Sequence, residues 1–162
     1  MTTFLLILIA ALLLLSASAM TNLTATTPRT WRKVDERVIT TYPAAAALFA
    51  GAAVDEDGNG QVNNLTGAGT TFAGITLQGC TAQGDRIDVA TKGEVLLTIA
   101  KGSAIAASDL GATVYAGDGN DFNLTVTSRQ AIGKVVEVPV AAVGVNTAAC
   151  WVYIEGVQKR SI

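Results

Sequence analysis

Short apolar runs, separated by clusters of Gly, Asn and Asp, make up most of the chain from Leu48 onward. Runs of this length are typical of strands, and the clusters supply the positive-φ positions that tight turns need. No segment from Val38 onward has sustained helical periodicity. The pattern therefore predicts an all-β fold of about nine or ten strands, arranged as a small barrel or sandwich.

Two predicted hairpins organise the middle of the chain. A DEDGN turn joins residues 48–54 to 60–64, and Lys92-Gly93 joins 86–91 to 94–100. Around the second turn, apolar residues alternate with less apolar ones, which is the period of a half-buried sheet; they are Ile87, Val89, Val95, Leu97 and Ile99. The other predicted strands are 37–42, 71–77 at a sheet edge, 113–116, 121–127, 131–138 and 149–155, with one helical turn at 108–111.

The N-terminus has a different character. Residues 4–15 form an unbroken apolar run of 12 residues, shorter than the ~20 that a bilayer-spanning helix needs. The run precedes Ser16-Ala17-Ser18-Ala19, so three interpretations stay open: a signal peptide cut after Ala19, a start assigned upstream of Met20, or a hydrophobic segment retained in an assembly. Residues 1–3 contain no Lys or Arg, which favours the last two taken together.

We therefore expect three parts: a hydrophobic segment 1–19, an extended basic arm 20–36 that a partner orders, and a β domain 37–162. Charged residues make up only 15% of the 162-residue chain, against roughly 25% in an ordinary soluble domain. So little charge predicts extensive contact with partners and an oligomer.

Charge is unevenly distributed along the chain. Residues 29–37 read RTWRKVDER, with four basic and two acidic residues, whereas residues 38–157 carry five basic and eleven acidic ones. A basic arm with a Trp could contact nucleic acid, but the acidic body argues against that. The distribution favours docking of the arm onto an acidic protein surface, with no nucleic-acid partner.

The sequence contains no histidine, which removes the commonest general base and metal ligand. The clustered carboxylates lie in predicted turns, where solvated loop acids are the expected reading; they are Asp55, Glu56, Asp57, Asp118 and Asp121. We expect a protein that is not an enzyme and has no cofactor.

One turn resembles a metal site. Asp55, Asp57 and Asn59, followed by Gly60, match the first half of an EF-hand loop. Position 12 of that pattern is Thr66 rather than Glu, and no amphipathic helices flank it. The motif favours a β-turn over a calcium site, with these three residues as a weak candidate.

The redox state expected of Cys80 and Cys150 depends on the compartment in which the protein folds. Export would favour a disulfide, whereas assembly in a reducing cytoplasm favours free thiols. We expect free thiols.

Three segments carry a resemblance to a known family: LFAGAAVDEDGNGQVNNLTGAGTTFAGITL, GDRIDVATKGEVLLTIA and DLGATVYAGDGNDFNLTVTSRQAIGKVVE. In the order of strands and turns, residues 20–154 resemble the capsid decoration (cement) proteins of tailed bacteriophages. The resemblance implies a β-tulip-like barrel on the outer capsid surface of the virion, stabilising contacts between major capsid subunits. It also implies a homotrimer with no chemistry of its own and no membrane in the mature assembly.

Within the arm, we expect Arg29, Trp31, Arg32 and Lys33 to contact the shell, because Trp and Arg are enriched at interface hot spots. Trp31 could equally cover one end of the barrel. The alternative function is an exported periplasmic or extracellular binding or adhesion module, with a cleaved signal peptide and a disulfide between the two cysteines.

Overall fold

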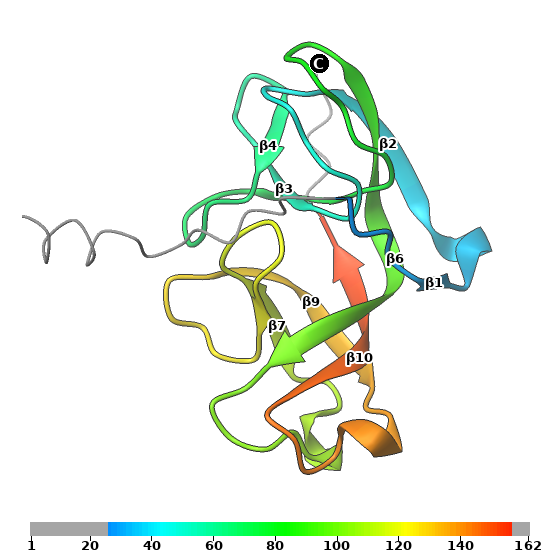
Figure 1. The fold of residues 1–162 in the computed structure, drawn as a ribbon, viewed down its shortest axis with the longest axis vertical. Coiled ribbons are helices and arrows are strands. Elements are labelled where there is room, and N and C mark those ends of the chain that lie inside the picture. The colour runs from blue at the N-terminus through cyan, green and yellow to red at the C-terminus, as the bar shows by residue number, and fades with distance from the viewer. Residues whose placement is uncertain (1–25, 157–162) are drawn as a thin grey trace, which may run out of the picture.

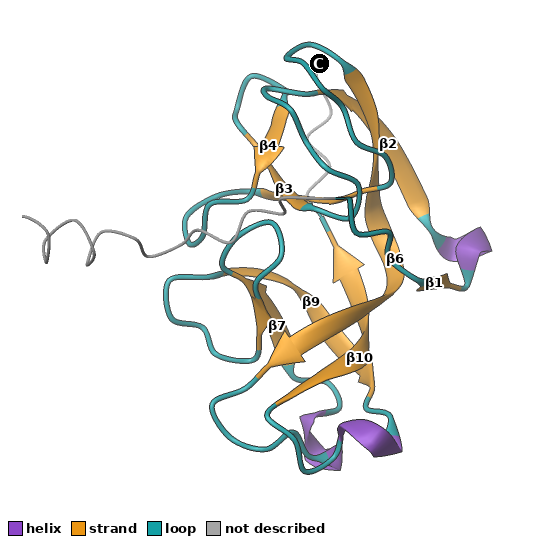
Figure 2. Ribbon diagram, in the orientation of Figure 1, coloured by secondary structure: helices purple, strands orange, loops and turns teal. Residues whose placement is uncertain are grey.

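The computed structural model describes residues 26–156, and this part of the chain contains no α-helix (Figures 1 and 2). The predicted all-β fold is confirmed. Three single 3-10 turns interrupt the strands: η1 (Val34–Glu36), η2 (Ala107–Asp109) and η3 (Val140–Ala142). The strands are β1 (Trp31–Arg32), β2 (Val38–Pro43), β3 (Ala53–Glu56), β4 (Val62–Asn64), β5 (Phe72–Thr76), β6 (Arg86–Ala100), β7 (Thr113–Ala116), β8 (Phe122–Asn123), β9 (Gln130–Glu137) and β10 (Thr147–Glu155).

Five strands close into a barrel in the order β10-β9-β7-β8-β6, with β6 pairing back onto β10. The β6–β8 pair is parallel, and the other pairs in the ring are antiparallel. Its core contains Val95, Leu97 and Ile99 of β6, and Cys150 and Val152 of β10, all buried. This barrel forms the lower half of the molecule in Figure 1.

The upper half, which we call the upper lobe, is built on the first half of β6. There β5 and β2 flank β6 on opposite sides, because both pair with Val89 and Ala90. The sheet continues through β3 to β4, and a bridge from Ala44 to Val62 brings the end of β2 back to β4. The upper lobe has its own buried core. The strand predicted at residues 71–77 is confirmed as β5, but it lies between β3 and β6 rather than at an edge.

The hairpin predicted at Lys92-Gly93 is wrong: β6 is one strand of 15 residues that runs through both residues. Its apolar residues show why, since Ile87, Val89, Val95, Leu97 and Ile99 all occupy odd positions and are all buried. A two-residue turn would have placed the first two and the last three on opposite faces of the sheet. One continuous strand therefore serves both cores.

The DEDGN hairpin is confirmed, with β3 and β4 paired from Val54–Asn64 to Glu56–Val62. Its strand begins later than predicted and includes two of the acidic residues. Asp55 and Glu56 lie within β3 and are 7% and 9% exposed, and Asp118 is also 9% exposed. The expectation that these three acids are solvated in turns is therefore wrong.

Candidate interaction surface

The arm lies against its own domain wherever the structure describes it. The Thr27 amide donates to the Ala50 carbonyl (3.0 Å), and the Leu96 amide donates to the Thr30 carbonyl (2.9 Å). Trp31 and Arg32 then pair with Val95 and Glu94 of β6 as strand β1. The expectation that a partner orders the arm is thus wrong for residues 26–36, and β1 and η1 are part of the folded domain.

β1 and β10 lie on opposite sides of β6, because Glu94 and Val95 pair with both strands. Arg32 reaches across β6 on the outer face of this sheet. Its guanidinium forms ion pairs with Glu94 of β6 and Glu137 of β9, and its Cζ lies 4.5 Å from the ring centre of Trp151 in β10. A planar cation can stack on an aromatic ring and bind carboxylates at its rim at the same time.

Lys33 completes this arrangement, which we call the Arg32 cluster: Arg32, Lys33, Glu94, Glu137 and Trp151. The Lys33 ammonium lies 2.5 Å from a Glu94 carboxylate oxygen. Lys33 has a left-handed backbone, with φ and ψ both 51°, a conformation that costs a non-glycine residue about 1–2 kcal/mol. The ion pair lies at the turn from β1 into η1.

Glu94 is the centre of the Arg32 cluster. Its side chain is only 8% exposed. The hydrogen bond from Lys33 lowers its pKa most, burial opposes this, and Arg32 lowers it further. A buried carboxylate held by two cations stays ionised at neutral pH.

Trp31 packs on the barrel, which is one of the two roles considered from sequence, and its contact with a shell stays a prediction. It is half-buried against the barrel core, and the Cζ of Arg37 lies 5.3 Å from its ring centre. Gly93 of β6 lies beneath it, where an added Cβ would come within 3.4 Å of the Trp31 ring. Trp31 therefore covers the middle of β6 and still contributes to the surface.

Arg29 lies farther along β6, away from the Arg32 cluster. Its Nε donates to the Gly51 carbonyl (2.9 Å), one Nη donates to the Asn120 side-chain oxygen (2.6 Å), and its Cζ lies 5.2 Å from the Phe122 ring centre. Burial lowers the pKa of this guanidinium. A pocket of about 430 Å³ adjoins it.

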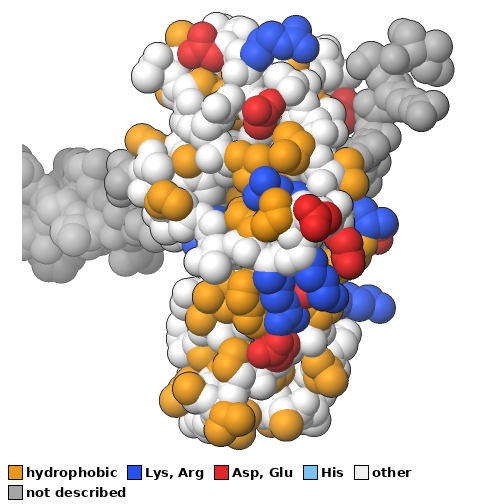
Figure 3. Space-filling view, turned by 90° about the vertical axis from the view of Figure 1, so that its right-hand side faces the viewer, with side chains coloured by type: hydrophobic (Ala, Val, Ile, Leu, Met, Phe, Trp, Pro, Cys, Tyr) orange, Lys and Arg blue, Asp and Glu red, His pale blue; other side chains and the backbone are white. Residues whose placement is uncertain are grey.

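Trp151 forms one wall of an apolar pocket of about 330 Å³. The other walls come from β6, β10 and the β9–β10 connection, through Leu96, Pro139, Ala141, Ala142, Ala148 and Ala149. Val140, which lies between the wall residues Pro139 and Ala141 in sequence, is 92% exposed. Figure 3 shows the face turned toward β1 and η1, where basic side chains gather near the middle and hydrophobic ones lie above and below them.

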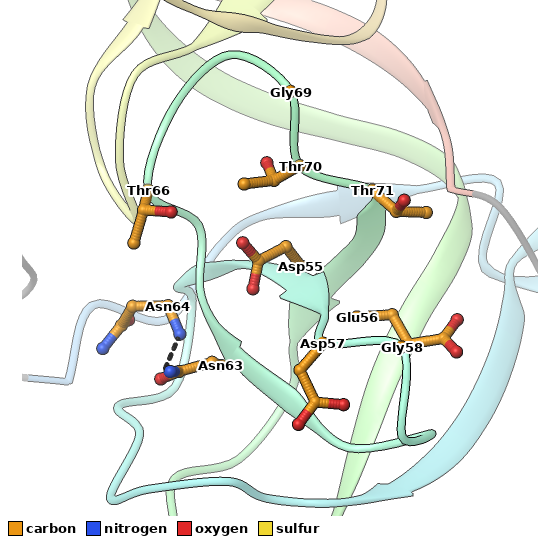
Figure 4. A pocket seen from close by; sticks show the side chains of 10 residues that line it. All are labelled: Asp55, Glu56, Asp57, Gly58, Asn63, Asn64, Thr66, Gly69, Thr70 and Thr71. Atoms are coloured by element: carbon orange, nitrogen blue, oxygen red, sulfur yellow. Dashed lines mark hydrogen bonds between the residues drawn. The ribbon is translucent and has the colours of Figure 1, made fainter.

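The candidate calcium turn contains an Asx turn. Asp57 accepts hydrogen bonds from the amides of Asn59 (2.8 Å) and Gln61 (3.2 Å), which is the pattern of an Asx turn. Asp55 points toward the loop that carries Thr66 and Thr70, into a polar pocket of about 450 Å³ (Figure 4). Among residues 26–156, no group of three or more Cys, Asp or Glu side chains is placed to hold a metal ion.

The surroundings of Asp55 destabilise its ionised form. Burial raises its pKa to about 6; the repulsion of Asp57 adds to this, while hydrogen bonds from the backbone amides of Asp55 and Thr66 oppose it. Neighbouring Glu56 points to the other side of the strand, and one of its carboxylate oxygens is buried without a hydrogen-bond partner in the described structure (Figure 4).

The two cysteines lie in different parts of the fold, and both are free thiols. Cys150 is buried in the barrel core, where burial raises its pKa. Cys80 is half-exposed and packs against the core of the upper lobe.

The structure thus joins Arg32 and Lys33 in one cluster and leaves Arg29 in a separate pocket. Sequence reasoning missed Glu94, Glu137 and Trp151. A signal for Trp151 was present, because Trp151 and Tyr153 alternate with buried residues of β10 and must face outward. The pairing of Arg32 with a glutamate 105 residues later has no local signal.

No protein-family model and no curated protein matches the chain. Within the described part of the chain, no helix has the length and apolar character needed to cross a membrane.

Proposed function

We propose that this chain is a structural virion protein that binds the outer surface of an icosahedral phage head and stabilises contacts between major capsid subunits. The observation that carries the proposal is the outer face of β6 and β10, where Trp151 stacks with Arg32 and lines an apolar pocket. Aromatic and Arg side chains around an apolar centre are the composition of protein-binding hot spots. The resemblance to decoration proteins supplies the identity of the partner.

The mechanism is thermodynamic. A protein that binds only the expanded, assembled shell stabilises that state by mass action. The Arg32 cluster is prepared for binding, because its side chains already hold their positions through ion pairs within the chain. Less side-chain entropy is then lost on association.

A co-sedimentation assay tests the proposal. Purified protein is mixed with expanded heads that lack it, and the bound fraction is measured after pelleting. We expect saturable binding to expanded heads and none to unexpanded ones. The proposal fails if the protein stays in the supernatant with both.

Two exposed valines give a matched pair for the same assay. Val140→Asp places a charge beside the apolar pocket, whereas Val126→Asp places one in the β8–β9 connection, where Val126 is 61% exposed. We expect Val140→Asp to weaken head binding at least tenfold, a change of about 1.4 kcal/mol, and Val126→Asp to leave it unchanged. Equal affinities would place the contact elsewhere.

The intact mass of the protein in purified particles, measured without reducing agent, separates this function from the exported alternative. A head-bound chain with both thiols reduced supports the virion role. A chain absent from particles and recovered from periplasm or medium with an oxidised pair of cysteines supports the binding or adhesion module.

We also propose a homotrimer, and sedimentation equilibrium of the purified protein tests that assembly.

A further inference from the structure

Arg29 differs from its neighbours in the arm in what its charge contacts. Arg32 and Lys33 each pair with carboxylates of their own domain. The Arg29 guanidinium donates only to the neutral oxygens of Gly51 and Asn120 and stacks on a phenyl ring. Among the described residues, it has no carboxylate partner.

This arrangement leaves a positive charge partly removed from water and uncompensated. A guanidinium has five N–H donors, and here two hydrogen bonds to neutral groups engage part of the fork. Desolvation without an opposite charge costs free energy, and a bidentate carboxylate is the group that best recovers it. Stacking on Phe122 holds the plane of the fork, so one edge can face an incoming ligand.

The pocket beside Arg29 has room and polarity for such a group. It measures about 430 Å³, and Thr98, Asn120 and Thr147 contribute polar side chains to its walls. Asp121 also lines it, but its carboxylate binds Arg129, with Nε and Nη2 both 2.9 Å from the same oxygen. Among the described residues that line the pocket, the charge left without an ion pair is therefore the positive charge of Arg29.

The single positive charge of Arg29 favours a ligand with one negative charge over one with more. A carboxylate carries one negative charge and neutralises Arg29. A phosphate monoester carries about −1.5 to −2 at neutral pH and would leave an excess negative charge beside Asp121. The acidic body of the chain, with eleven acidic and five basic residues in 38–157, further disfavours a polyanion.

We propose that the Arg29 pocket receives an aspartate or glutamate side chain from the capsid protein to which this chain binds. The proposal rests on the function proposed above and names the chemistry of the partner's contact: an acidic side chain that reaches the pocket between β6, β8 and the start of β10. Binding supplies the anion that Arg29 lacks among residues 26–156.

Head binding provides the first test. Arg29→Gln removes the charge, Arg29→Lys keeps the charge but removes the planar fork, and Arg86→Gln removes an exposed charge at the start of β6. We expect at least tenfold weaker binding for Arg29→Gln, an intermediate loss for Arg29→Lys, and no change for Arg86→Gln. Wild-type affinity for Arg29→Gln would overturn the proposal while leaving the head-binding function intact.

Titration of the purified wild-type protein with sodium acetate tests the pocket without heads. The readout is the ¹⁵N–¹H resonance of the Arg29 side chain, with the Arg32 side chain as an internal control. We expect a saturable shift of Arg29 in the millimolar range and a smaller one for Arg32, whose charge is already paired with Glu94 and Glu137. No shift of Arg29 overturns the inference, even if heads are bound.

The two tests together identify the source of the carboxylate. An acetate response with weakened head binding of Arg29→Gln supports a side chain of the capsid protein. An acetate response with unchanged head binding indicates a free small carboxylate and overturns the proposal. If the wild-type protein binds no heads, the proposed function is wrong. The absence of an acetate response is a separate result, and it shows that the Arg29 pocket does not bind a carboxylate.

Discussion

Asp55 and Glu94 are carboxylates with little exposure, and their neighbours shift their pKa values in opposite directions. Burial and the nearby Asp57 raise the pKa of Asp55 to about 6, from 3.8. Hydrogen bonds from Lys33 and Arg32 lower that of Glu94 below 4.5 despite burial. An ionised carboxylate therefore destabilises the fold at Asp55 and stabilises it at Glu94.

Asp55→Asn should stabilise the protein at neutral pH. The folded state holds the Asp55 proton more tightly than the unfolded state, so wild-type stability falls as pH rises from about 4 to 6. At pH 7 we expect the Asn variant to gain about 1–3 kcal/mol in free energy of unfolding, and below about pH 4 to gain almost nothing. Urea denaturation between pH 4 and 7 measures this, and a loss of stability at pH 7 would contradict it.

Glu94→Gln should have the opposite effect. Because the folded-state pKa of Glu94 is lowered, its contribution is present above the unfolded value of 4.5 and is lost as pH falls through the folded value. We expect the variant to lose about 1–2 kcal/mol at pH 7, since two cations lose a common partner. The difference should shrink as pH falls below 4.5 in the same denaturation series, and a difference that does not depend on pH would indicate lost packing instead.

At the scale of elements, the close approach of β9 to β10 depends on Gly133. A Cβ at this position would lie 2.1 Å from the Tyr153 carbonyl oxygen. Backbone on the neighbouring strand cannot move aside without breaking the pairing of Ile154 with Gly133. The barrel therefore closes at this point only without a side chain.

Gly133→Ala should accordingly destabilise the barrel by several kcal/mol, about 3 or more, because the clash is with backbone. Gly102→Ala is the matched control, since nothing lies within 4 Å of a Cβ there and its φ is not positive. Thermal denaturation of both variants measures the effect. Similar melting temperatures would show that β9 and β10 can separate at little cost.

The elements also show what could be read from local pattern. The strand at Thr113–Ala116 was predicted with its exact bounds, and the β3–β4 hairpin was predicted from its DEDGN turn. The predicted turn at Lys92-Gly93 was wrong, because a Lys-Gly pair is compatible with a turn but does not require one. The apolar residues from Ile87 to Ile99 are separated by even numbers of positions, and this already excluded a two-residue turn between them.

At the scale of the whole molecule, two separate cores share one strand. The barrel core and the upper-lobe core both pack on β6, through Val95 and Leu97 in one and Ile87 and Val89 in the other. Disordering either core removes the contacts that hold half of this strand. The two halves should therefore unfold together although their cores are distinct.

Ile87→Ala in the upper lobe and Ile132→Ala in the barrel test this coupling. Both side chains are fully or almost fully buried, so each truncation should cost about 2–5 kcal/mol. We expect calorimetry to show one transition in both variants, moved to lower temperature, with equal calorimetric and van't Hoff enthalpies. Two resolved transitions in either variant would mean that the halves fold independently.

The candidate surface could be predicted only in part. The Arg and Trp content of the arm indicated a contact region, and the structure places Arg32 and Lys33 on an exposed face. Their partners Glu94 and Glu137 lie 62 and 105 residues beyond Arg32 in sequence. No local pattern indicates pairings over such separations, because sheet topology alone brings these strands together.

The sequence by itself determined the all-β character, most turn positions and the buried face of each long strand. These depend on backbone preference and on alternation between neighbouring residues, which act over a few positions. Only the tertiary structure decided that β6 pairs with β10 to close the barrel, that the arm docks on its own domain, and that Asp55 is buried while Arg29 has no carboxylate partner in the described chain. Pairing, burial and charge compensation arise from residues distant in sequence, and the fold is what brings those residues together.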